Sequence, residues 1–169
     1  MGRKAVVLFG AILGLGLLVG TAQAADKFAY VDLSRLFSEY NKTKDFDKVL
    51  SEKENVYTAE REKKVNEIKS VQDKLSLLSD KEKENKKGDL ESKVKVLKEY
   101  DRQKQTDLRK DQDEKMKEIL KNIQDTVKNY AEKEGYTMVF NDRVLVYQVK
   151  SMDITDKILE LLNKGYSKK

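Results

Sequence analysis

The central part of the chain constrains its fold most strongly. Residues 43 to 134 contain one glycine, Gly88, and the whole sequence contains no proline. Because proline breaks helix interiors and residues such as Lys and Glu favour them, this stretch predicts long, solvated helices. Apolar side chains recur at heptad-like spacing in two blocks, residues 46–78 and residues 90–130. Between the blocks, residues 79–89 contain no apolar side chain, which predicts a turn there.

The two blocks predict an antiparallel hairpin, which we call the arm (residues 43–134), with helices of about 45 residues and about 65–70 Å each. In such a hairpin the numbers of facing residues sum to a constant, and apolar residues obey this rule near both ends. The predicted pairs are Leu78 with Leu90, Leu75 with Val94, Val71 with Leu97, Ile68 with Tyr100, Leu50 with Ile119, Val49 with Leu120, and Phe46 with Ile123.

The same register predicts a weak middle for the arm. Residues 51–64 would face residues 104–117 without an apolar seam, so surface ion pairs and helix propensity would hold the helices together there. We expect bending or splaying in this stretch. A solvated gap that the arm merely tolerates fits the pattern equally well.

The composition excludes most kinds of active site. The chain has no His and no Cys, so it cannot form a Ser-His-Asp or Cys-His system, a zinc site of the usual nitrogen and sulfur kind, or a disulfide framework. It also has no phosphate-binding loop. Residues 43–134 carry 24 basic and 23 acidic side chains of alternating sign, which argues against a nucleic-acid-binding face. We predict no enzyme activity, no cofactor, no metal and no nucleic acid.

The first 24 residues have the pattern of a secretory signal peptide. Arg3 and Lys4 precede an uncharged run over residues 5–20, and Ala22-Gln23-Ala24 supplies small residues for a signal peptidase. The alternative is a retained anchor, but this run is shorter than the about 20 residues that a membrane span needs. Cleavage after Ala24 is therefore the favoured interpretation, and a lipid-anchored form would need a Cys.

The segments on either side of the arm, residues 25–42 and 135–169, predict a small body of the α+β class into which the arm is inserted. Residues 27–32 have the alternation of a strand, and residues 33–40 have helical spacing. A body of this size buries little surface, and its strands leave open edges. We therefore expect a homo-oligomer that shares its strands.

The second half of the body predicts two more strands and a helix. After Gly135, a candidate helix C-cap, residues 136–140 and 144–149 predict a hairpin that turns at Asn141-Asp142, with both apolar faces covered. Asp153 predicts the start of a final helix. Asp32 and Asp153 also suggest a carboxylate pair, but helix capping is the favoured role for each because no base or metal partner is evident.

These residues resemble the Skp (OmpH-like) family of periplasmic chaperones. The resemblance rests on residues 28–32 with the following Leu36-Phe37, on residues 135–147, and on the closing residues 153–163, whereas the arm matches in kind, length and placement. It implies a homotrimer with a β-barrel-like body, whose three arms enclose a cavity that holds unfolded outer-membrane proteins without ATP. Because the arm lysines are offset by acids, we carry over no site for lipopolysaccharide or an anionic membrane.

Candidate site residues form two groups. Those expected in the body core or an oligomer interface are Phe28, Tyr30, Val31, Phe37, Val139, Phe140, Val144, Val146 and Tyr147. Those that could face a client are Tyr57, Leu108, Val56 and Met116. Packing within the hairpin is the simpler interpretation for most of the second group, and Tyr57 and Leu108 are favoured because their predicted register partners are polar.

Three classes of function follow in order of preference. The first is a client-binding, ATP-independent holdase chaperone in the periplasm, which needs no catalytic residue. The second is a structural coiled-coil spacer or adaptor of the cell envelope, which would bind a folded partner and ignore unfolded clients. An enzyme is a distant third.

Overall fold

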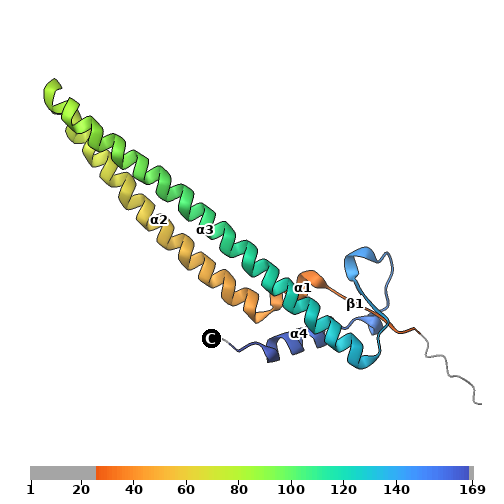
Figure 1. Ribbon diagram of the computed structural model, residues 1–169. Coiled ribbons are helices and arrows are strands. Elements are labelled where there is room, and N and C mark those ends of the chain that lie inside the picture. The colour runs from red at the N-terminus through yellow and green to blue at the C-terminus, as the bar shows by residue number, and fades with distance from the viewer. Residues whose placement is uncertain (1–25, 168–169) are drawn as a thin grey trace, which may run out of the picture.

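The computed structural model describes residues 26–167, and it shows a small body from which a long helical hairpin projects (Figure 1). In chain order the elements are β1 (Phe28–Val31), α1 (Leu33–Glu39), α2 (Asn41–Ser76), α3 (Asp80–Glu134), β2 (Met138–Asn141), the 3-10 turns η1 (Asp142–Val144) and η2 (Lys150–Met152), and α4 (Thr155–Gly165). The predicted class, α+β and mostly helical, is confirmed. The predicted signal peptide, residues 1–24, lies outside the described residues.

The turn of the hairpin lies earlier than predicted. Helix α2 ends at Ser76 and α3 begins at Asp80, so residues 80–89 are helical. Ser79 and Glu82 form a capping box that starts α3, which fixes the helix start before the charged run. Lys and Glu are good helix formers, and one glycine inside a helix costs only about 1 kcal/mol. The absence of apolar side chains therefore marked a solvated helix and was wrongly interpreted as a turn.

The earlier turn changes the register of the two helices. Tyr100, predicted to face Ile68, instead stacks on Tyr57 with ring centroids 5.8 Å apart and donates a hydrogen bond to Glu60. Helix α3 is thus displaced toward the base by about two turns relative to the prediction. The apolar spacing was compatible with both registers because heptad repeats look alike after a shift.

The two helices differ in length because α3 belongs to both parts of the molecule. Helix α2 has 36 residues and α3 has 55, or about 54 Å and about 82 Å. The C-terminal part of α3 passes the base of the arm and enters the body (Figure 1), where Ile119 and Ile123 are buried. They share one core with Leu36 of α1 and with Ile158 and Leu162 of α4.

The sheet of the body differs from the prediction. Strands β1 and β2 pair in parallel, with Phe28 opposite Met138 and Val31 opposite Asn141, and they are the two strands of the described chain. Residues 144–149 do not form the predicted strand. Asn141 accepts a hydrogen bond from the Arg143 backbone N–H at 3.3 Å and starts the 3-10 turn η1, so the predicted tight hairpin does not form.

Of three capping predictions, those for Asp32 and Gly135 are confirmed, and that for Asp153 is displaced by one residue. Asp32 accepts a hydrogen bond from the Arg35 N–H at 2.8 Å and caps α1. Gly135 ends α3 with a φ of 70°, the left-handed conformation that favours glycine. Asp153 lies one residue before the N-cap position of α4 and accepts a hydrogen bond from the Thr155 N–H at 2.9 Å.

Candidate functional site

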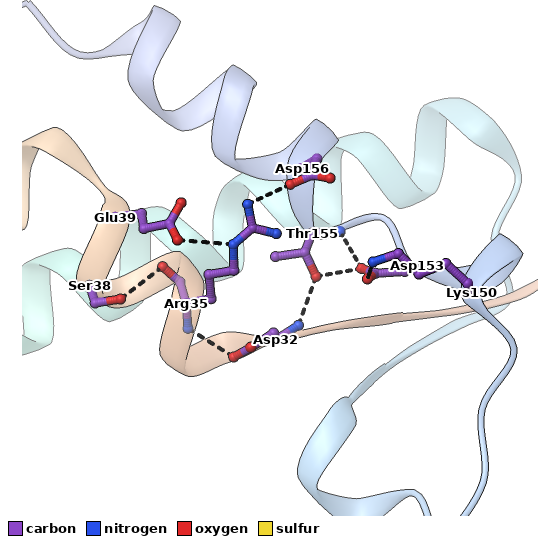
Figure 2. A network of polar contacts seen from close by, with 8 residues as sticks. All are labelled: Asp32, Arg35, Ser38, Glu39, Lys150, Asp153, Thr155 and Asp156. Atoms are coloured by element: carbon purple, nitrogen blue, oxygen red, sulfur yellow. Dashed lines mark hydrogen bonds and ion pairs between the residues drawn. The ribbon is translucent and has the colours of Figure 1, made fainter.

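A buried threonine joins the two ends of the body. Figure 2 shows the Thr155 hydroxyl between two loops, where it accepts a hydrogen bond from the Asp32 N–H at 2.9 Å and donates one to Asp153 at 2.6 Å. Burial raises the pKa of Asp153, but hydrogen bonds from Lys150 and Thr155 outweigh it and hold that pKa below its ordinary value. The two aspartates are therefore structural, as the sequence analysis favoured.

An ion-paired arginine extends this contact along α1. Arg35 lies 3.0 Å from Glu39 on its own helix and 2.7 Å from Asp156 at the start of α4 (Figure 2). The Ile154 N–H also donates to the Tyr30 carbonyl at 3.1 Å. These bonds fix α4 against β1 and α1, so the chain after the arm is held by the chain before it.

The body exposes an apolar segment, the exposed strip (residues 144–149). Val144, Val146 and Tyr147 have most of their surface exposed, at 69%, 106% and 82%. All three were predicted in the body core or an oligomer interface, and within one chain they are not core. The other predicted residues lie inside or at the edge of the body: Tyr30 and Val31 are buried, Phe37 and Val139 pack against the core, and Phe28 lies beside Phe140.

An apolar groove lies between β2 and the base of α3. It has a volume of about 480 Å³ and is lined chiefly by apolar side chains, among them Leu33, Leu120, Val127, Met138 and Val139. Leu120 and Met138 are exposed. The chain thus presents both an exposed strip and an open groove on the same body.

The middle of the arm is held by a polar and aromatic cluster, the central clasp (Tyr57, Glu60, Arg61, Tyr100 and Asp101). Asp101 accepts hydrogen bonds from Tyr57 at 3.1 Å and from Arg61 at 3.1 Å. Burial, followed by the hydrogen bond to Glu60, raises the pKa of Tyr100 to about 12. A further ion pair joins Lys53 to Asp111.

No side chain of residues 44–67 is buried, so the predicted lack of a dry seam is confirmed for α2. Polar bonds between the two helices span this gap.

A second ionic cluster holds the base of the arm. Glu118 lies 2.6 Å from both Lys42 and Lys115. Hydrogen bonds from Lys115 and then from Lys42 lower the pKa of Glu118 to about 2. Lys42 is on α2 and Glu118 is on α3, so this pair ties the two helices together where they meet the body.

The four candidate client-facing residues occupy different environments. Val56 and Met116 are exposed, at 55% and 40%. Tyr57 contacts α3 within the central clasp, and half-buried Leu108 lies two turns from Asp101 on the same helix face. The predicted register of Tyr57 is therefore wrong, because its ring stacks on Tyr100 and its hydroxyl donates to Asp101. Client contact stays a prediction for all four residues.

Two features of the arm were not predicted from the sequence. The central clasp was hidden by the wrong register, and the apolar tip around Leu77 was hidden because its leucines were expected to pack against α3. The Ser79-x-x-Glu82 capping pattern was the signal that would have located the turn and revealed both. None of the helices between residues 26 and 167 has the length and apolar character that a bilayer crossing requires.

The fold defines a class of proteins in which a small body with a strand pair carries a long inserted helical hairpin. A crystal structure of an OmpH-like protein from Caulobacter crescentus has this fold, with a TM-score of 0.75 over 83% of this chain and 86% of the other at 12% identity. The chain belongs to the family described as outer membrane protein (OmpH-like), whose sequence pattern matches residues 27–162. The resemblance stated from the sequence is thus confirmed.

Two relatives match nearly the whole chain. The chaperone protein Skp of Pectobacterium atrosepticum is 30% identical over 154 residues, which cover 87% of this chain and 93% of that protein. The chaperone protein Skp of Yersinia enterocolitica is 29% identical over 157 residues, which cover 90% of this chain and 96% of that protein.

Proposed function

We propose that this chain is an ATP-independent periplasmic holdase chaperone that binds unfolded outer-membrane β-barrel proteins. Its relatives are named as chaperones, and their similarity extends over the body and the arm together. The proposal rests mainly on an arm whose central third has no buried side chain on α2 and exposes Val56, while Met116 of α3 is exposed nearer the base. Such a surface offers many weak contacts to a chain that has no fixed shape.

The chaperone acts as a homotrimer in this proposal. The exposed strip of one subunit covers the apolar groove of the next, which removes two apolar surfaces from water at once. Strand pairing between subunits would also satisfy the backbone groups of residues 144–149. Three arms then enclose a cavity in which the client is held, with Val56 and Met116 as client contacts.

Export by the cleaved signal peptide places this activity in the periplasm. Cell fractionation tests this part, because the mature chain should start at residue 25 and appear in the periplasmic fraction. A chain that keeps residues 1–24 and stays with the inner membrane would contradict it.

The decisive experiment dilutes a urea-unfolded outer-membrane β-barrel protein into buffer with and without the mature chain. Light scattering reports aggregation, and multi-angle scattering gives the mass of the complex in the same run. We expect suppressed aggregation without ATP and a mass of one client with three subunits. Unchanged aggregation would overturn the chaperone function, and a different subunit number would overturn the trimer.

A structural spacer of the cell envelope is the second candidate. The unbroken helices α2 and α3, tied by the central clasp, favour it because they form a rod of fixed register. It predicts a stable folded partner and no effect on client aggregation, so the same experiment separates the two functions.

A further inference from the structure

The arm meets the N-terminal part of the body at a joint of one residue. Tyr40 ends α1 and precedes α2, and its backbone is extended, with a ψ of 125°. The Tyr40 side chain makes no capping hydrogen bond, and the first turn of α2 contains no acidic residue. The start of α2 therefore lacks the two local features that usually stabilise a helix N-terminus, a capping side chain and a nearby negative charge.

The missing cap comes from the other end of the chain. Asn163 of α4 accepts, at its side-chain oxygen, a hydrogen bond from the Asn41 N–H at 2.8 Å, although the two residues are 122 positions apart. Asparagine is among the preferred capping residues because its short side chain places an acceptor beside a free N–H. In Figure 1 the C-terminal end of α4 lies beside the start of α2, as this bond requires.

A tyrosine that follows α4 makes a second contact with the same joint. The Tyr166 ring meets the Tyr40 ring edge to face, with centroids 5.8 Å apart and an interplanar angle of 72°, a favoured aromatic arrangement. The Tyr166 hydroxyl also donates a hydrogen bond to Asp45, in the second turn of α2, at 3.3 Å. Tyr40 is 4% exposed, so Tyr166 packs on a buried side chain of the joint itself.

These two residues lie outside the buried core. Among the described residues, Leu162 is the last that is buried, whereas Asn163 and Tyr166 are half-buried. The sequence pattern of the family also matches as far as residue 162. The contacts of Asn163 and Tyr166 with α2 are therefore additions at the edge of the matched body, and we expect the core to form without them.

The other tie at the base of α2 acts on a different neighbour. Lys42 pairs with Glu118 and so joins α2 to α3. Asn163 and Tyr166 instead join α2 to α4, and α4 is fixed to α1 by the ion pair between Arg35 and Asp156. They therefore relate α2 to α1, the two helices on either side of the joint.

We propose that Asn163 and Tyr166 form a C-terminal latch that fixes the direction in which α2 leaves the body. Helix α3 needs no such latch, because Ile119 and Ile123 bury its base in the core. Without the latch, α2 would tilt about Tyr40 while α3 kept its place. This inference goes beyond the proposed function, because the latch sets the geometry of the arm whether the arm contacts an unfolded client or a folded partner.

The test places a spin label on each side of the joint in the mature chain. The sequence has no Cys, so Ser34→Cys on α1 and Glu52→Cys on α2 create two unique labelling sites at exposed positions. Double electron-electron resonance then measures the distribution of distances between the labels. Dilution of the labelled chain with excess unlabelled chain limits the signal to pairs within one chain. We expect one narrow distribution.

Variants of the latch should widen this distribution. Asn163→Ala and Tyr166→Ala should each broaden it, and the double variant should broaden it most. Tyr166→Phe keeps the ring on Tyr40 and should leave the distribution narrow. Lys164→Ala is the matched control, because Lys164 is an exposed residue between the two latch residues, and it should behave as the parent chain does.

Amide hydrogen exchange gives a second measurement. In the double variant the amides of residues 44–50 should exchange roughly five-fold faster, because the start of α2 has lost its cap and opens more often. The amides of residues 119–127 of α3 should exchange as in the parent chain, since their burial does not depend on the latch.

Two results would overturn the latch. The first is a distance distribution in the double variant equal to that of Lys164→Ala. The second is faster exchange in residues 119–127 as well, which would show that Asn163 and Tyr166 support the whole core and have no particular effect on the joint. Suppression of client aggregation by the unmodified chain is measured separately, so the failure of the latch and the failure of the chaperone function are distinguishable.

Discussion

The base and the middle of the arm use the same two helices but hold them together in different ways. At the base, Ile119 and Ile123 of α3 are buried in a core shared with α1 and α4. In the middle, the helices are joined by the stacked pair Tyr57 and Tyr100 and by ion pairs at the surface. Apolar burial is strong and insensitive to salt, whereas exposed ion pairs contribute at most about 1 kcal/mol each. The arm is therefore firmly anchored to the body, and its two helices are only weakly joined along the middle.

The largest expected effect comes from removing the anchor. Ile119→Ala should lower the free energy of unfolding by about 2–5 kcal/mol, because it leaves a cavity at a fully buried site. Urea denaturation followed by circular dichroism measures it. Val96→Ala, on the same helix and 50% exposed, is the matched control and should cost under about 1 kcal/mol. Equal losses for the two variants would contradict the placement of the core.

A smaller and local effect is expected from opening the middle. Tyr57→Ala removes the ring stack and the hydrogen bond to Asp101, which together contribute about 1–2 kcal/mol. Amide hydrogen exchange should become faster in residues 51–64 and 97–111 and stay unchanged in the body. Val56→Ala, which alters an exposed neighbour, should leave the exchange pattern as it is. Faster exchange in β1 or α4 would show that the two regions are not independent.

The alkaline titration of Tyr100 reports on the middle of the arm alone. Its folded-state pKa of about 12 exceeds the ordinary value of 10, so its contribution to stability is complete below pH 10 and is lost as the pH rises toward 12. Ultraviolet absorbance of the phenolate should show a late-titrating tyrosine. Glu60→Gln should lower that pKa, since it removes the carboxylate that accepts the Tyr100 proton in a hydrogen bond. An unchanged late titration in Glu60→Gln would exclude this contact.

The smallest effect is expected in acid, at the ionic cluster of the base. The pKa of Glu118 is lowered from 4.5 to about 2, so its contribution is present above pH 4.5 and is lost as the pH falls toward 2. The Glu118 side chain is 42% exposed, so solvent screening limits the effect to under about 1 kcal/mol. Comparing the acid unfolding of the parent chain with that of Glu118→Gln measures it. The variant should lose part of the pH dependence between pH 4.5 and pH 2, and identical curves would refute the role of Glu118.

The body and the arm were predictable from sequence to different degrees. Strand β1, helix α1 and the Gly135 cap were predictable because each follows from side chains a few residues apart. The register of the arm was not, since it depends on a turn near residue 78 that only the capping box indicates. Residues 144–149 have strand composition, yet strand formation depends on a pairing partner, and within one chain β2 pairs with β1.

The candidate contact surfaces were less predictable than the fold. Val56 and Met116 are exposed, whereas Tyr57 stacks on Tyr100 because the register differs from the predicted one, and client contact stays a prediction for these residues. The apolar end of the arm around Leu77 was not predicted, because Leu75 and Leu78 were expected to pack against Val94 and Leu90. A helix face can be read from spacing, but what lies opposite that face depends on the position of the turn.

The parallel pairing of β1 with β2 joins two segments that are far apart in the sequence. The backbone of Lys27 hydrogen-bonds to Thr137, 110 residues later, so β1 has no partner strand until the chain has passed residue 138. Closing a loop of that length as flexible chain is slow and entropically costly. The hairpin forms from local contacts and brings its two ends together, which shortens the effective loop to a few residues. We expect the arm to serve in this way as the template on which the body closes, so a circular permutant opened at the tip should fold more slowly.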